Sequence, residues 1–441
     1  LENLGFRLVR FKTGTPPRAN SRSLDYGKMT SLPGEDVHRA FSFLNVLPKN
    51  EQLPCWLTHT TPTTHQIITD NLHRTALYGG NIVGAGPRYC PSIESKIGEF
   101  PGKDSHQVFV EPEGRDTQEV YLSGVSTSLP ADVQMEVARS IPGLEKVEFL
   151  RLAYAIEYDC LKPHQLELSL QSKDISGLYF AGQINGSSGY EEAAAQGLMA
   201  GINAGLALQD KPPFILRRDE AYIGVLIDDI VTKDIDEPYR MMTSLAEYRL
   251  LLRQDNADRR LGEHARQLGL ISRERYDAIQ RKWEAVDAEI AALAKWRITP
   301  SEENNALLKA VGTTPSTQVL TGQELMRRPE IKYKELSTLG FSSDLDQELQ
   351  TLVEIEIKYA GYIQKEQRSV ERFMSMEARV LPHWIDYENI VGLSNEAVER
   401  LKNVRPQSLG QASRIPGVSP ADISVLVVYL EQQRRKAGDT K

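Results

Sequence analysis

The chain has 441 residues, enough for about three domains, and its 40% hydrophobic and 25% charged residues are typical of a soluble globular protein. The formal net charge of -8 argues against nucleic-acid binding by bulk charge, so any polyanion contact must use a local basic patch. The three cysteines, Cys55, Cys90 and Cys160, contain no C-x-x-C pair, which argues against a disulfide framework or a cysteine zinc site and favours a reducing cytosol. No apolar run reaches the roughly 18 residues of a membrane span, and no signal-peptide pattern opens the chain.

The chain opens with a pattern that resembles the middle of a domain. A helix is predicted to end at Gly5, and an alternating strand is predicted over residues 6–11. We therefore expect that an N-terminal part of this domain is missing from the chain.

A proline-containing loop is predicted next, over residues 12–20 (KTGTPPRAN). The prolines exclude a helix and favour a fixed, extended conformation. Lys12 and Arg18 place two cations beside this loop. The cations either face a ligand or belong to a solvated turn.

A cysteine-bearing loop follows a helix that is predicted to begin at Thr61, with proline at its first position. In residues 78–100 (YGGNIVGAGPRYCPSIESKIGEF), glycines and a proline predict a rigid backbone loop. Arg88 is suited to bind a phosphate or carboxylate with two hydrogen bonds. Arg88 and Lys96 would also lower the pKa of Cys90 and favour its thiolate. The alternative is a buried structural cysteine in a tight loop.

The region up to residue 170 is predicted to be rich in strands. Short strands are expected at residues 108–110, 119–122 and 147–150, and Val133, Val137 and Ile141 share one face of a helix. Residues 153–159 (AYAIEYD) alternate, so Glu157 and Asp159 lie on one side of a strand. These two carboxylates are either a catalytic pair or part of a solvated edge.

A glycine-rich stretch over residues 177–208 is the strongest local signal for a ligand site. Residues 178–181 predict a buried strand, residues 182–189 a loop, and the Ser188–Glu191 capping box a helix that begins at about Gly189. Free N–H groups and the positive end of the helix dipole converge at such a point and favour electron-rich oxygens. The alternative is a tightly packed strand, loop and helix without a ligand.

Beyond residue 213 helix signals dominate. Ser244 and Glu247 form a capping box for a helix with an apolar stripe of Leu245, Tyr248 and Leu252. An arginine row accompanies this helix and is either a solvated, salt-bridged face or a contact to the phosphate backbone of a nucleic acid. Its members are Arg240, Arg249, Arg253 and Arg260.

The last third of the chain is predicted to be entirely helical. A capped helix begins near residue 301, and a long amphipathic helix covers residues 345–373. In residues 413–423 (SRIPGVSPADI) a Pro-Gly turn joins two helices, with Ser419 as the N-cap of the second and Asp422 at its third position. This hairpin either contacts a nucleic-acid backbone or only packs the C-terminal module.

Seven stretches together carry a resemblance to a known family, in the order in which that family has them. They are KTGTPPR (12–18), GPRYCPSIESK (86–96), STSLPADVQ (126–134), YAIEYD (154–159), GLYFAGQINGSSGYEEAAAQG (177–197), EPYRMMTSLAEYRLLLRQDNAD (237–258) and ASRIPGVSPADI (412–423). On these motifs the chain resembles the glucose-inhibited division protein A family, the FAD-binding subunits of the tRNA uridine 5-carboxymethylaminomethyl modification enzyme. The resemblance spans essentially the whole chain.

The resemblance implies an α/β fold: the remainder of a Rossmann-type FAD-binding domain with an inserted mixed α/β part, followed by an all-helical C-terminal region. The implied domains are the FAD-binding part with its insertion over residues 1–210, a helical region over 211–360, and a C-terminal helical partner-docking module over 361–441. The family normally begins with a Rossmann-type glycine fingerprint for the FAD pyrophosphate. This sequence does not contain the fingerprint, so FAD binding by this chain needs its own test.

The resemblance also implies an activity. In the family, a homodimer works with a GTPase partner, in a heterotetramer, to add an aminomethyl or carboxymethylaminomethyl group to C5 of the wobble uridine of certain tRNAs. Methylenetetrahydrofolate supplies the one-carbon unit, ammonium or glycine the amine, and NADH the reducing equivalents through FAD. The chain is therefore expected to be a cytoplasmic tRNA-modifying flavoprotein without membrane association.

Site residues carry over from the family's motifs at matching positions. The resemblance implies that Cys90 is catalytic and that Gln183 contacts the flavin, and it places Arg240 and Arg249 near flavin or tRNA phosphate. Arg253 of the arginine row is the third expected nucleic-acid contact. Other cofactor contacts are expected in the same loop at Gly182, Asn185, Gly186 and Glu191. The stretch expected to bind the nicotinamide nucleotide consists of Gly86, Pro87, Arg88, Tyr89, Cys90, Pro91, Ser92, Ile93, Glu94, Ser95, Lys96, Ile97, Gly98, Glu99 and Phe100.

Two other functions remain open from the sequence. One is the related folate- and FAD-dependent tRNA uridine C5-methyltransferase, which shares the flavin loop but lacks the helical C-terminal module. The other is a non-catalytic fragment that binds tRNA and the partner. Residues 405–429 favour the modification subunit over the methyltransferase.

Overall fold

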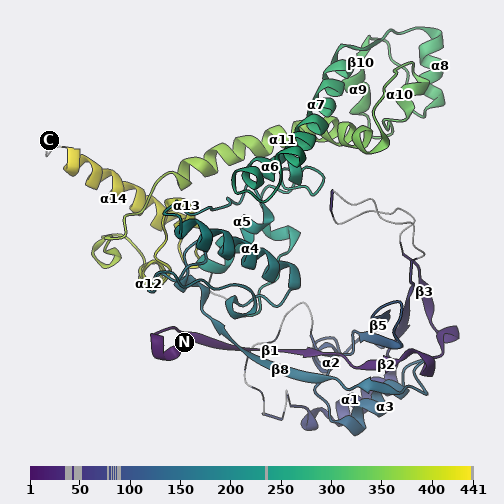
Figure 1. The fold of residues 1–441 in the computed structure, drawn as a ribbon, viewed down its shortest axis with the longest axis vertical. Coiled ribbons are helices and arrows are strands. Elements are labelled where there is room, and N and C mark those ends of the chain that lie inside the picture. Colours follow the sequence, from purple (N-terminus) through teal and green to yellow (C-terminus); the bar gives the residue numbers. More distant parts are fainter. Residues whose placement is uncertain are drawn as a thin grey trace. The chain divides into compact units, whose positions relative to one another are not determined.

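The computed structural model describes residues 1–34, 42–43, 52–76, 79–80, 82, 84, 86, 91–233 and 237–438. The chain folds into two compact units (Figure 1). The first comprises Leu1–Pro163, Gly182–Ala193 and Ile235–Arg240, and the second comprises His164–Ala181, Ala194–Asp234 and Met241–Lys441. A mixed α/β part followed by a helical region is the fold class that the sequence predicts, and it is confirmed. The expectation that this region is entirely helical is wrong in one place, because residues 297–298 and 320–321 pair as a short antiparallel ribbon.

A six-stranded sheet forms the centre of the first unit. Its strand order is β3-β4-β5-β6-β2-β7, and its paired strands are antiparallel. The strands are β2 (Arg18–Asn20), β3 (Thr30–Leu32), β4 (Cys55–His59), β5 (Gln107–Pro112), β6 (Glu119–Ser123) and β7 (Phe149–Arg151). The strands expected at residues 108–110 and 119–122 are thus confirmed as parts of β5 and β6, and the one expected at 147–150 begins at Phe149.

One face of this sheet is the core of the unit and the other face is polar. Every second side chain on β5 and β6 points into the core and is almost fully buried. These side chains are Val108 and Val110 on β5, and Val120 and Leu122 on β6. These side chains pack against Ala138 of helix α3 (Ala131–Arg139). Helix α3 in turn packs against helices α1 (Pro62–Asp70) and α2 (Ile93–Glu99). Alternation therefore turns the intervening side chains toward the opposite face, where the site described below lies.

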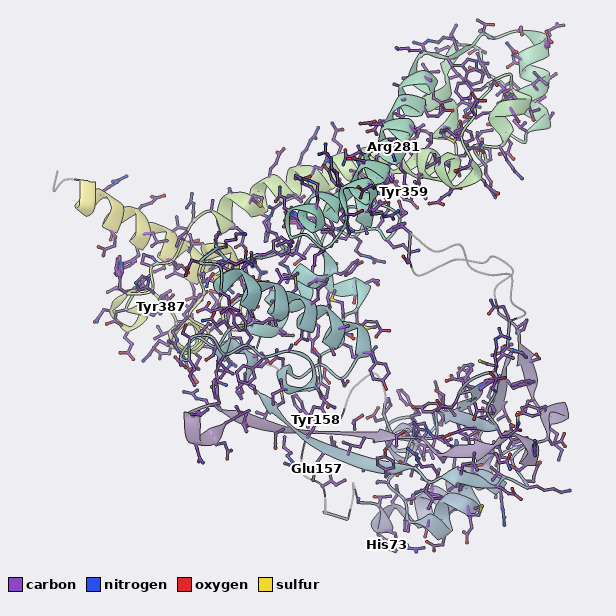
Figure 2. The ribbon with its side chains drawn as sticks, viewed as in Figure 1. His73, Glu157, Tyr158, Arg281, Tyr359 and Tyr387 are labelled. Carbon is purple, nitrogen blue, oxygen red and sulfur yellow. The ribbon has the colours of Figure 1, made fainter. Side chains whose placement is uncertain are left out.

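A long two-stranded ribbon leads to the sheet. β1 (Leu8–Thr15) pairs antiparallel with β8 (Tyr154–Leu161) along its whole length. The neighbouring residues Glu157 and Tyr158 of β8 lie on opposite sides of the ribbon (Figure 2). On one side Arg10 forms ion pairs with Glu157 and Asp159, at 3.5 and 2.8 Å, and on the other side Tyr158 packs edge-on against Phe11. Of the two interpretations of Glu157 and Asp159, the structure therefore supports the edge of a strand, where both carboxylates form ion pairs.

The loop predicted over residues 12–20 is wrong for its first part. Residues 12–15 (KTGT) belong to strand β1 and pair with β8.

The segment 178–181 does not form the strand that its apolar run predicts. A single bridge joins Tyr179 to Gln171, and the Phe180 N–H donates to the Leu170 carbonyl at 3.0 Å. A run of apolar residues becomes a strand only where a partner strand continues the ladder, and here the pairing stops after one bridge. The glycine loop and the helix that follow are as expected: α4 (Tyr190–Ala207) begins one residue after Gly189.

Helices make up most of the second unit. They include α5 (Tyr222–Thr232), α6 (Ala257–Gln267), α7 (Arg273–Lys295), α8 (Glu302–Ala310), α9 (Gly322–Met326), α10 (Glu335–Thr338), α11 (Gln347–Glu377), α12 (Asn395–Val404), α13 (Leu409–Ser413) and α14 (Pro420–Gly438), with a short ribbon of β9 (Arg297–Ile298) and β10 (Leu320–Thr321). The cap at Ser301 and the long helix expected over residues 345–373 are confirmed. Within the described residues, no helix has the length and apolar character needed to cross a membrane.

The helix predicted from the Ser244–Glu247 capping box is wrong. Residues 243–245 form a single 3-10 turn, and the next α-helix begins at Ala257. The Glu247 carboxylate accepts a 2.8 Å hydrogen bond from Arg218 instead of capping a helix. Tyr248 and Leu252 are nonetheless buried, so the apolar residues of the predicted stripe pack without the helix. Tertiary contacts outweigh the local capping signal here.

Two hydrophobic cores stabilise the second unit. The first joins α7 to α11, with Trp283, Val286 and Leu293 of α7 packed near Leu352 and Val353 of α11. The second lies in the C-terminal module, where α12, α13 and α14 bury residues such as Leu401, Leu409 and Leu426.

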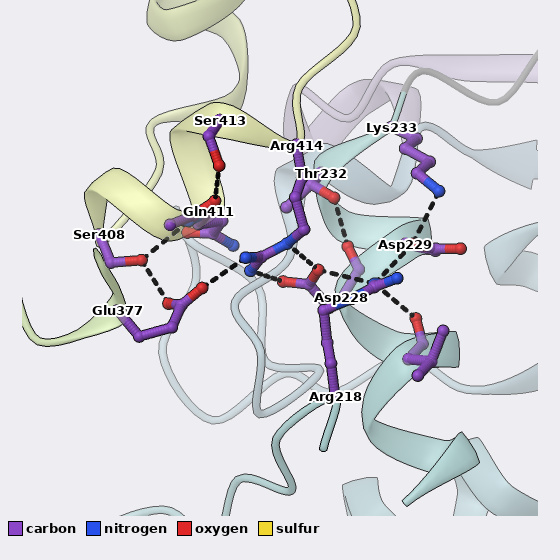
Figure 3. A network of polar contacts seen from close by, with 12 residues as sticks. Arg218, Asp228, Asp229, Thr232, Lys233, Glu377, Ser408, Gln411, Ser413 and Arg414 are labelled. Carbon is purple, nitrogen blue, oxygen red and sulfur yellow. Dashed lines mark hydrogen bonds and ion pairs between the residues drawn. The ribbon is translucent and has the colours of Figure 1, made fainter. Parts of the chain in front are cut away.

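A buried ion network ties α5 to the C-terminal module (Figure 3). The Arg218 guanidinium, 4% exposed, donates to Asp228 at 2.9 Å and to Asp229 at 2.6 Å. Arg414, just after α13, donates to both oxygens of Asp228 at 2.7 and 2.8 Å and also pairs with Glu377 at the end of α11. Each buried charge therefore has an opposite charge beside it, as burial requires.

The predicted hairpin near the C-terminus is confirmed, with Ser419 before Pro420 and Asp422 in the first turn of α14. Burial alone would raise the pKa of the Asp422 carboxyl, but hydrogen bonds from Ser394 and Ser419 lower its pKa to about 2. The Ser394 N–H donates at 2.8 Å and the Ser419 N–H at 2.9 Å. Asp422 thus clamps the start of α14 to the start of α12.

The Asp422→Asn variant is expected to be less stable than the wild type by about 1.5–3 kcal/mol at pH 7, because hydrogen bonds to a charged acceptor are lost. The folded pKa lies below the ordinary value of 3.8, so this stabilisation is fully present above about pH 4 and is lost as the pH falls through about 2. Urea unfolding followed by circular dichroism at pH 7, 4 and 2.5 checks this. A stability difference that stays constant down to pH 2.5 would contradict it.

Candidate functional site

A cavity of about 760 Å³ lies within the first unit, and its lining brings together segments that are far apart in the sequence. The end of the β1–β8 ribbon, the polar face of the six-stranded sheet, the glycine loop before α4 and Arg240 all contribute to it. Its size falls in the range of about 300–1,000 Å³ that small-molecule sites occupy.

The ribbon supplies the first wall. The last three residues of β1, Thr13, Gly14 and Thr15, pair with the first three of β8, which are Tyr154, Ala155 and Ile156. Five of these six residues line the cavity, and Ala155 does not. A side chain at position 14 would meet the Ser126 Oγ at 2.7 Å. Glycine at this position therefore lets the ribbon pack closely against the STSLP segment.

The polar face of the sheet supplies the second wall. In the register of the sheet, Tyr121 on β6 lies directly between Glu111 on β5 and Arg18 on β2. Glu113 lies two residues beyond Glu111 and forms a 3.5 Å ion pair with the Arg18 Nε. Burial is the main cause that raises the pKa of the Glu111 carboxyl, and the nearby negative charge of Glu113 raises it further. An aromatic ring, a cation and two carboxylates thus share one wall.

The glycine loop supplies the third wall. Gln183 and Glu191 are exposed and line the cavity together with residues 188–190 at the start of α4. Gly182, Asn185 and Gly186 are buried beneath them. Gly186 has a φ of +82°, its N–H donates to the Gln183 carbonyl at 3.0 Å, and its carbonyl accepts from Tyr239 at 2.7 Å. The loop conformation that presents Gln183 therefore depends on glycine.

Arg240 reaches the cavity from the segment that pairs with this loop. Its Nε donates to the buried Glu192 carboxylate at 3.1 Å. A side chain at position 189 would lie 1.8 Å from the Glu192 Oε2 and 2.9 Å from the Arg240 Nε. Glycine at 189 therefore makes room for this ion pair beside the N-terminus of α4. Of the three predicted phosphate-binding arginines, Arg240 is the one that the cavity includes.

The other two arginines have different surroundings. Arg249 is exposed, and no ion pair to it occurs among the described residues. Arg253 is only 11% exposed, pairs with Asp255 and Glu356, and donates to the Leu250 carbonyl at 2.7 Å. The surroundings of Arg253 favour the salt-bridged alternative, and those of Arg249 leave its guanidinium accessible to a phosphate.

The segment expected to bind the nicotinamide nucleotide is described only in part. Pro87, Arg88, Tyr89 and Cys90 lie outside the described residues, whereas Gly86 packs against the Lys12 side chain. Residues 91–100 lead into and form helix α2. Ser92 caps the start of this helix, because its Oγ accepts a hydrogen bond from the Ser95 N–H at 3.3 Å.

Glu94 fixes α2 to the STSLP segment. It is 1% exposed, and its Oε1 accepts from the Thr127 hydroxyl at 2.6 Å and from the Ser128 N–H at 2.9 Å. Lys96 donates to the Gly124 carbonyl at 3.0 Å. Glu94 and Lys96 therefore fix α2 to residues 124–128.

Comparison with known proteins identifies the chain's relatives. Residues 1–212 match the family model "Glucose inhibited division protein A". Residues 273–367 and 369–441 match the models "tRNA modifying enzyme MnmG/GidA C-terminal helical domain" and "tRNA modifying enzyme MnmG/GidA C-terminal helical bundle".

Among the relatives are proteins named "tRNA uridine 5-carboxymethylaminomethyl modification enzyme MnmG". The one from Bacillus subtilis (strain 168) is 55% identical over 435 residues, which cover 98% of this chain and 69% of the relative. The one from Listeria monocytogenes (strain EGD-e) is 55% identical over 433 residues, with the same coverage of 98% and 69%.

A solved structure supports the same assignment. The structure of Aquifex aeolicus GidA in its form II crystal matches with a TM-score of 0.87 and 44% sequence identity, covering 97% of this chain and 68% of that one. The chain therefore belongs to the glucose inhibited division protein A (MnmG/GidA) family.

Proposed function

We propose that this protein is an enzyme that installs the 5-carboxymethylaminomethyl group, or its aminomethyl counterpart, on the wobble uridine of tRNA. The relatives at 55% identity carry this activity in their names. The observation that carries the proposal is the cavity, because it brings together the KTGTPPR, YAIEYD and GQINGSSGYEE motifs and Arg240.

FAD is the cofactor that we propose for this cavity, and when bound it supplies hydride transfer. The residues present fit a flavin, because the Gln183 amide and the N–H groups at the start of α4 are suited to carbonyl oxygens and ring nitrogens. Glu191 and Arg240 add charged groups at the same wall. We further propose NADH as reductant, bound by residues 86–100, and methylenetetrahydrofolate as one-carbon donor.

Cys90 is the proposed nucleophile. Its thiolate would form a bond to C6 of uridine, which places an electron pair on C5 for bond formation with the one-carbon unit. Loss of the C5 proton and departure of the thiolate from C6 would then restore the C5–C6 double bond. The other cysteines support this choice: burial raises the pKa of Cys55, and it raises that of Cys160 to about 12, so both thiols stay protonated at neutral pH.

The proposed assembly is a cytoplasmic homodimer that joins a GTPase partner in a heterotetramer. The C-terminal module over residues 361–441, which contains α12, α13 and α14, is the proposed docking part for this partner. It has its own hydrophobic core, and the Arg414 contacts anchor it to α5.

Arg249 is the arginine that we expect to contact a tRNA phosphate. The Arg249→Ala variant should bind tRNA more weakly, and the slope of log K against log salt should become shallower by about one unit, because one fewer counterion is released. Fluorescence anisotropy of labelled tRNA at several salt concentrations measures both quantities. Arg273, with an 88% exposed side chain on α7, provides a control, since its replacement should leave the slope unchanged. An unchanged affinity of Arg249→Ala across the salt series would remove the assignment.

Reconstitution tests the proposed function. The protein is mixed with FAD, NADH, methylenetetrahydrofolate, glycine, the GTPase partner and unmodified tRNA, and the tRNA nucleosides are analysed by mass spectrometry. Carboxymethylaminomethyluridine that forms only with the partner supports the proposal. Transfer of a methyl group without the partner would show the methyltransferase instead. Binding of tRNA and partner without any product would show a non-catalytic binding protein.

A further inference from the structure

The sheet wall of the cavity contains a polar row that the flavin assignment leaves unused. Glu111, Tyr121 and Arg18 come from three neighbouring strands, and each is the direct cross-strand partner of the next. Adjacent strands lie about 4.8 Å apart, so the row spans about 10 Å of the wall. It consists of an acceptor, an aromatic ring and a donor, in that order.

The donor of the row is held in a fixed position. The Arg18 Nη1 donates to the Pro16 carbonyl at 2.9 Å and to the Thr15 hydroxyl, and the Nε lies 3.5 Å from Glu113. The guanidinium carbon lies 4.6 Å from the centroid of the Tyr121 ring. None of the contacts described for Arg18 uses Nη2, so this nitrogen can donate to a ligand. The Thr15 hydroxyl and the Pro16 carbonyl thus orient this donor.

The acceptor of the row lies at the opposite end. Glu113 is paired with Arg18, so its charge is balanced, whereas no ion pair to Glu111 occurs in the described part of the chain. Glu111 is half-buried, lines the cavity, and lies on the strand face opposite the core residues Val108 and Val110. The Ser123 side chain hydrogen-bonds the Glu111 carboxylate. A carboxylate has about four lone-pair sites, so it can accept a further hydrogen bond from a ligand N–H group that enters the cavity.

We infer that the row of Glu111, Tyr121 and Arg18 is the subsite for the uracil base of the substrate RNA. This inference rests on the proposed function. Glu111 accepts from the uracil N3–H, Arg18 donates to a flanking carbonyl, and the base packs against the paired Tyr121 and Arg18 side chains. Stacking on aromatic and guanidinium planes, with hydrogen bonds to the base edge, is how proteins read unpaired RNA bases.

The chemistry of the base explains why this wall suits uracil. The N3–H of uracil lies between the O2 and O4 carbonyls, so its edge alternates acceptor, donor and acceptor. A wall with a separate carboxylate and guanidinium complements that alternation. Cytosine has no N3–H and would present an acceptor to Glu111, which is unfavourable. When the N3 edge faces the sheet, C5 and C6 lie on the opposite edge of the ring and remain accessible to the reacting groups.

The test combines a variant with a modified substrate. Wild type and Glu111→Met are compared on two anticodon stem-loop RNAs, one with uridine and one with 3-methyluridine at the target position. Dissociation constants come from anisotropy, and kcat/KM comes from the reconstituted reaction. The wild type should prefer uridine by about 100-fold, because a site built to hydrogen-bond a donor rejects its methylated analogue. The Glu111→Met variant should lose about 100-fold on uridine and show no preference.

Two further variants sharpen the result. Glu111→Gln keeps an acceptor without the charge and should retain part of the preference, with a loss of about 10-fold on uridine. Glu119→Met is the matched control, since Glu119 lies on the same sheet face as Tyr121 but is not one of the residues that line the cavity. Its preference should equal that of the wild type.

The outcomes separate this inference from the proposed function. A Glu111→Met variant that still prefers uridine by about 100-fold would overturn the uracil subsite while leaving the modification activity intact. A wild-type protein that neither binds nor modifies the uridine stem-loop would overturn the proposed function and the subsite together.

Discussion

Replacement of Cys90 by serine is expected to abolish tRNA modification. A hydroxyl does not form the anion at neutral pH that a thiolate provides for addition to C6 of uridine. The rate should fall by at least about 1,000-fold, because the nucleophile acts as one unit with the groups around it. Nucleoside analysis after single-turnover reaction measures the loss, and the flavin spectrum shows whether the cofactor still binds.

The two other cysteines serve as controls for this variant. Cys55→Ser and Cys160→Ala should keep modification within a few-fold of the wild type, because both thiols have raised pKa values. Cys160 is fully buried, so alanine is the appropriate replacement there. Modification by Cys90→Ser at near wild-type rates would show that the nucleophile assignment is wrong.

Replacement of Arg218 by methionine is expected to destabilise the protein by about 3–5 kcal/mol. Removal of this guanidinium leaves Asp228 and Asp229, 4% and 0% exposed, without their shared counterion. Loss of one cation leaves each buried carboxylate with fewer charged partners, and this cost exceeds what the original ion pair contributed. Arg414 still contacts Asp228, and Lys233 still contacts Asp229 at 2.8 Å, so the loss should remain within this range.

The neighbouring arginine provides a matched control. Arg217 has a 41% exposed side chain and pairs with Asp219 and Glu220. Its replacement by methionine should cost no more than about 1 kcal/mol, since surface ion pairs contribute little. Thermal unfolding followed by circular dichroism, together with hydrogen exchange of α5 and α13, compares the two variants. Equal stability of the two would show that the buried network does not hold the C-terminal module.

Local signals in the sequence predicted many elements correctly. The caps at Thr61, Ser301 and Ser419 mark real helix starts, because a side chain that satisfies the first N–H groups acts within one turn of its own position. The alternation in residues 153–159 likewise identified β8. Two failures have one cause: the strand at 178–181 lacks a continuing partner, and the Glu247 carboxylate binds Arg218 instead of a helix end. Both depend on residues distant in the sequence.

The candidate site was predicted only in part. The glycine pattern pointed to the loop before α4, because backbone freedom and helix ends can be read locally, and the family resemblance added Gln183 within that loop. Glu111 and Tyr121 were not predicted, since their place beside Arg18 depends on the register of three strands from distant segments. One signal was available: period-two alternation places Glu111 on the face opposite Val108 and Val110. Alternation gives the face of a strand but not what lies opposite it.

Analysis of tRNA nucleosides from cells tests the central claim most directly. A bacterial strain that lacks its own wobble-uridine modification enzyme would express this protein, and its tRNA would be digested and analysed by mass spectrometry. The proposed function predicts that 5-carboxymethylaminomethyluridine or its aminomethyl counterpart appears, and that it is absent with the Cys90→Ser variant. Wobble uridine that stays unmodified, or that carries only a methyl group at C5, would contradict the account.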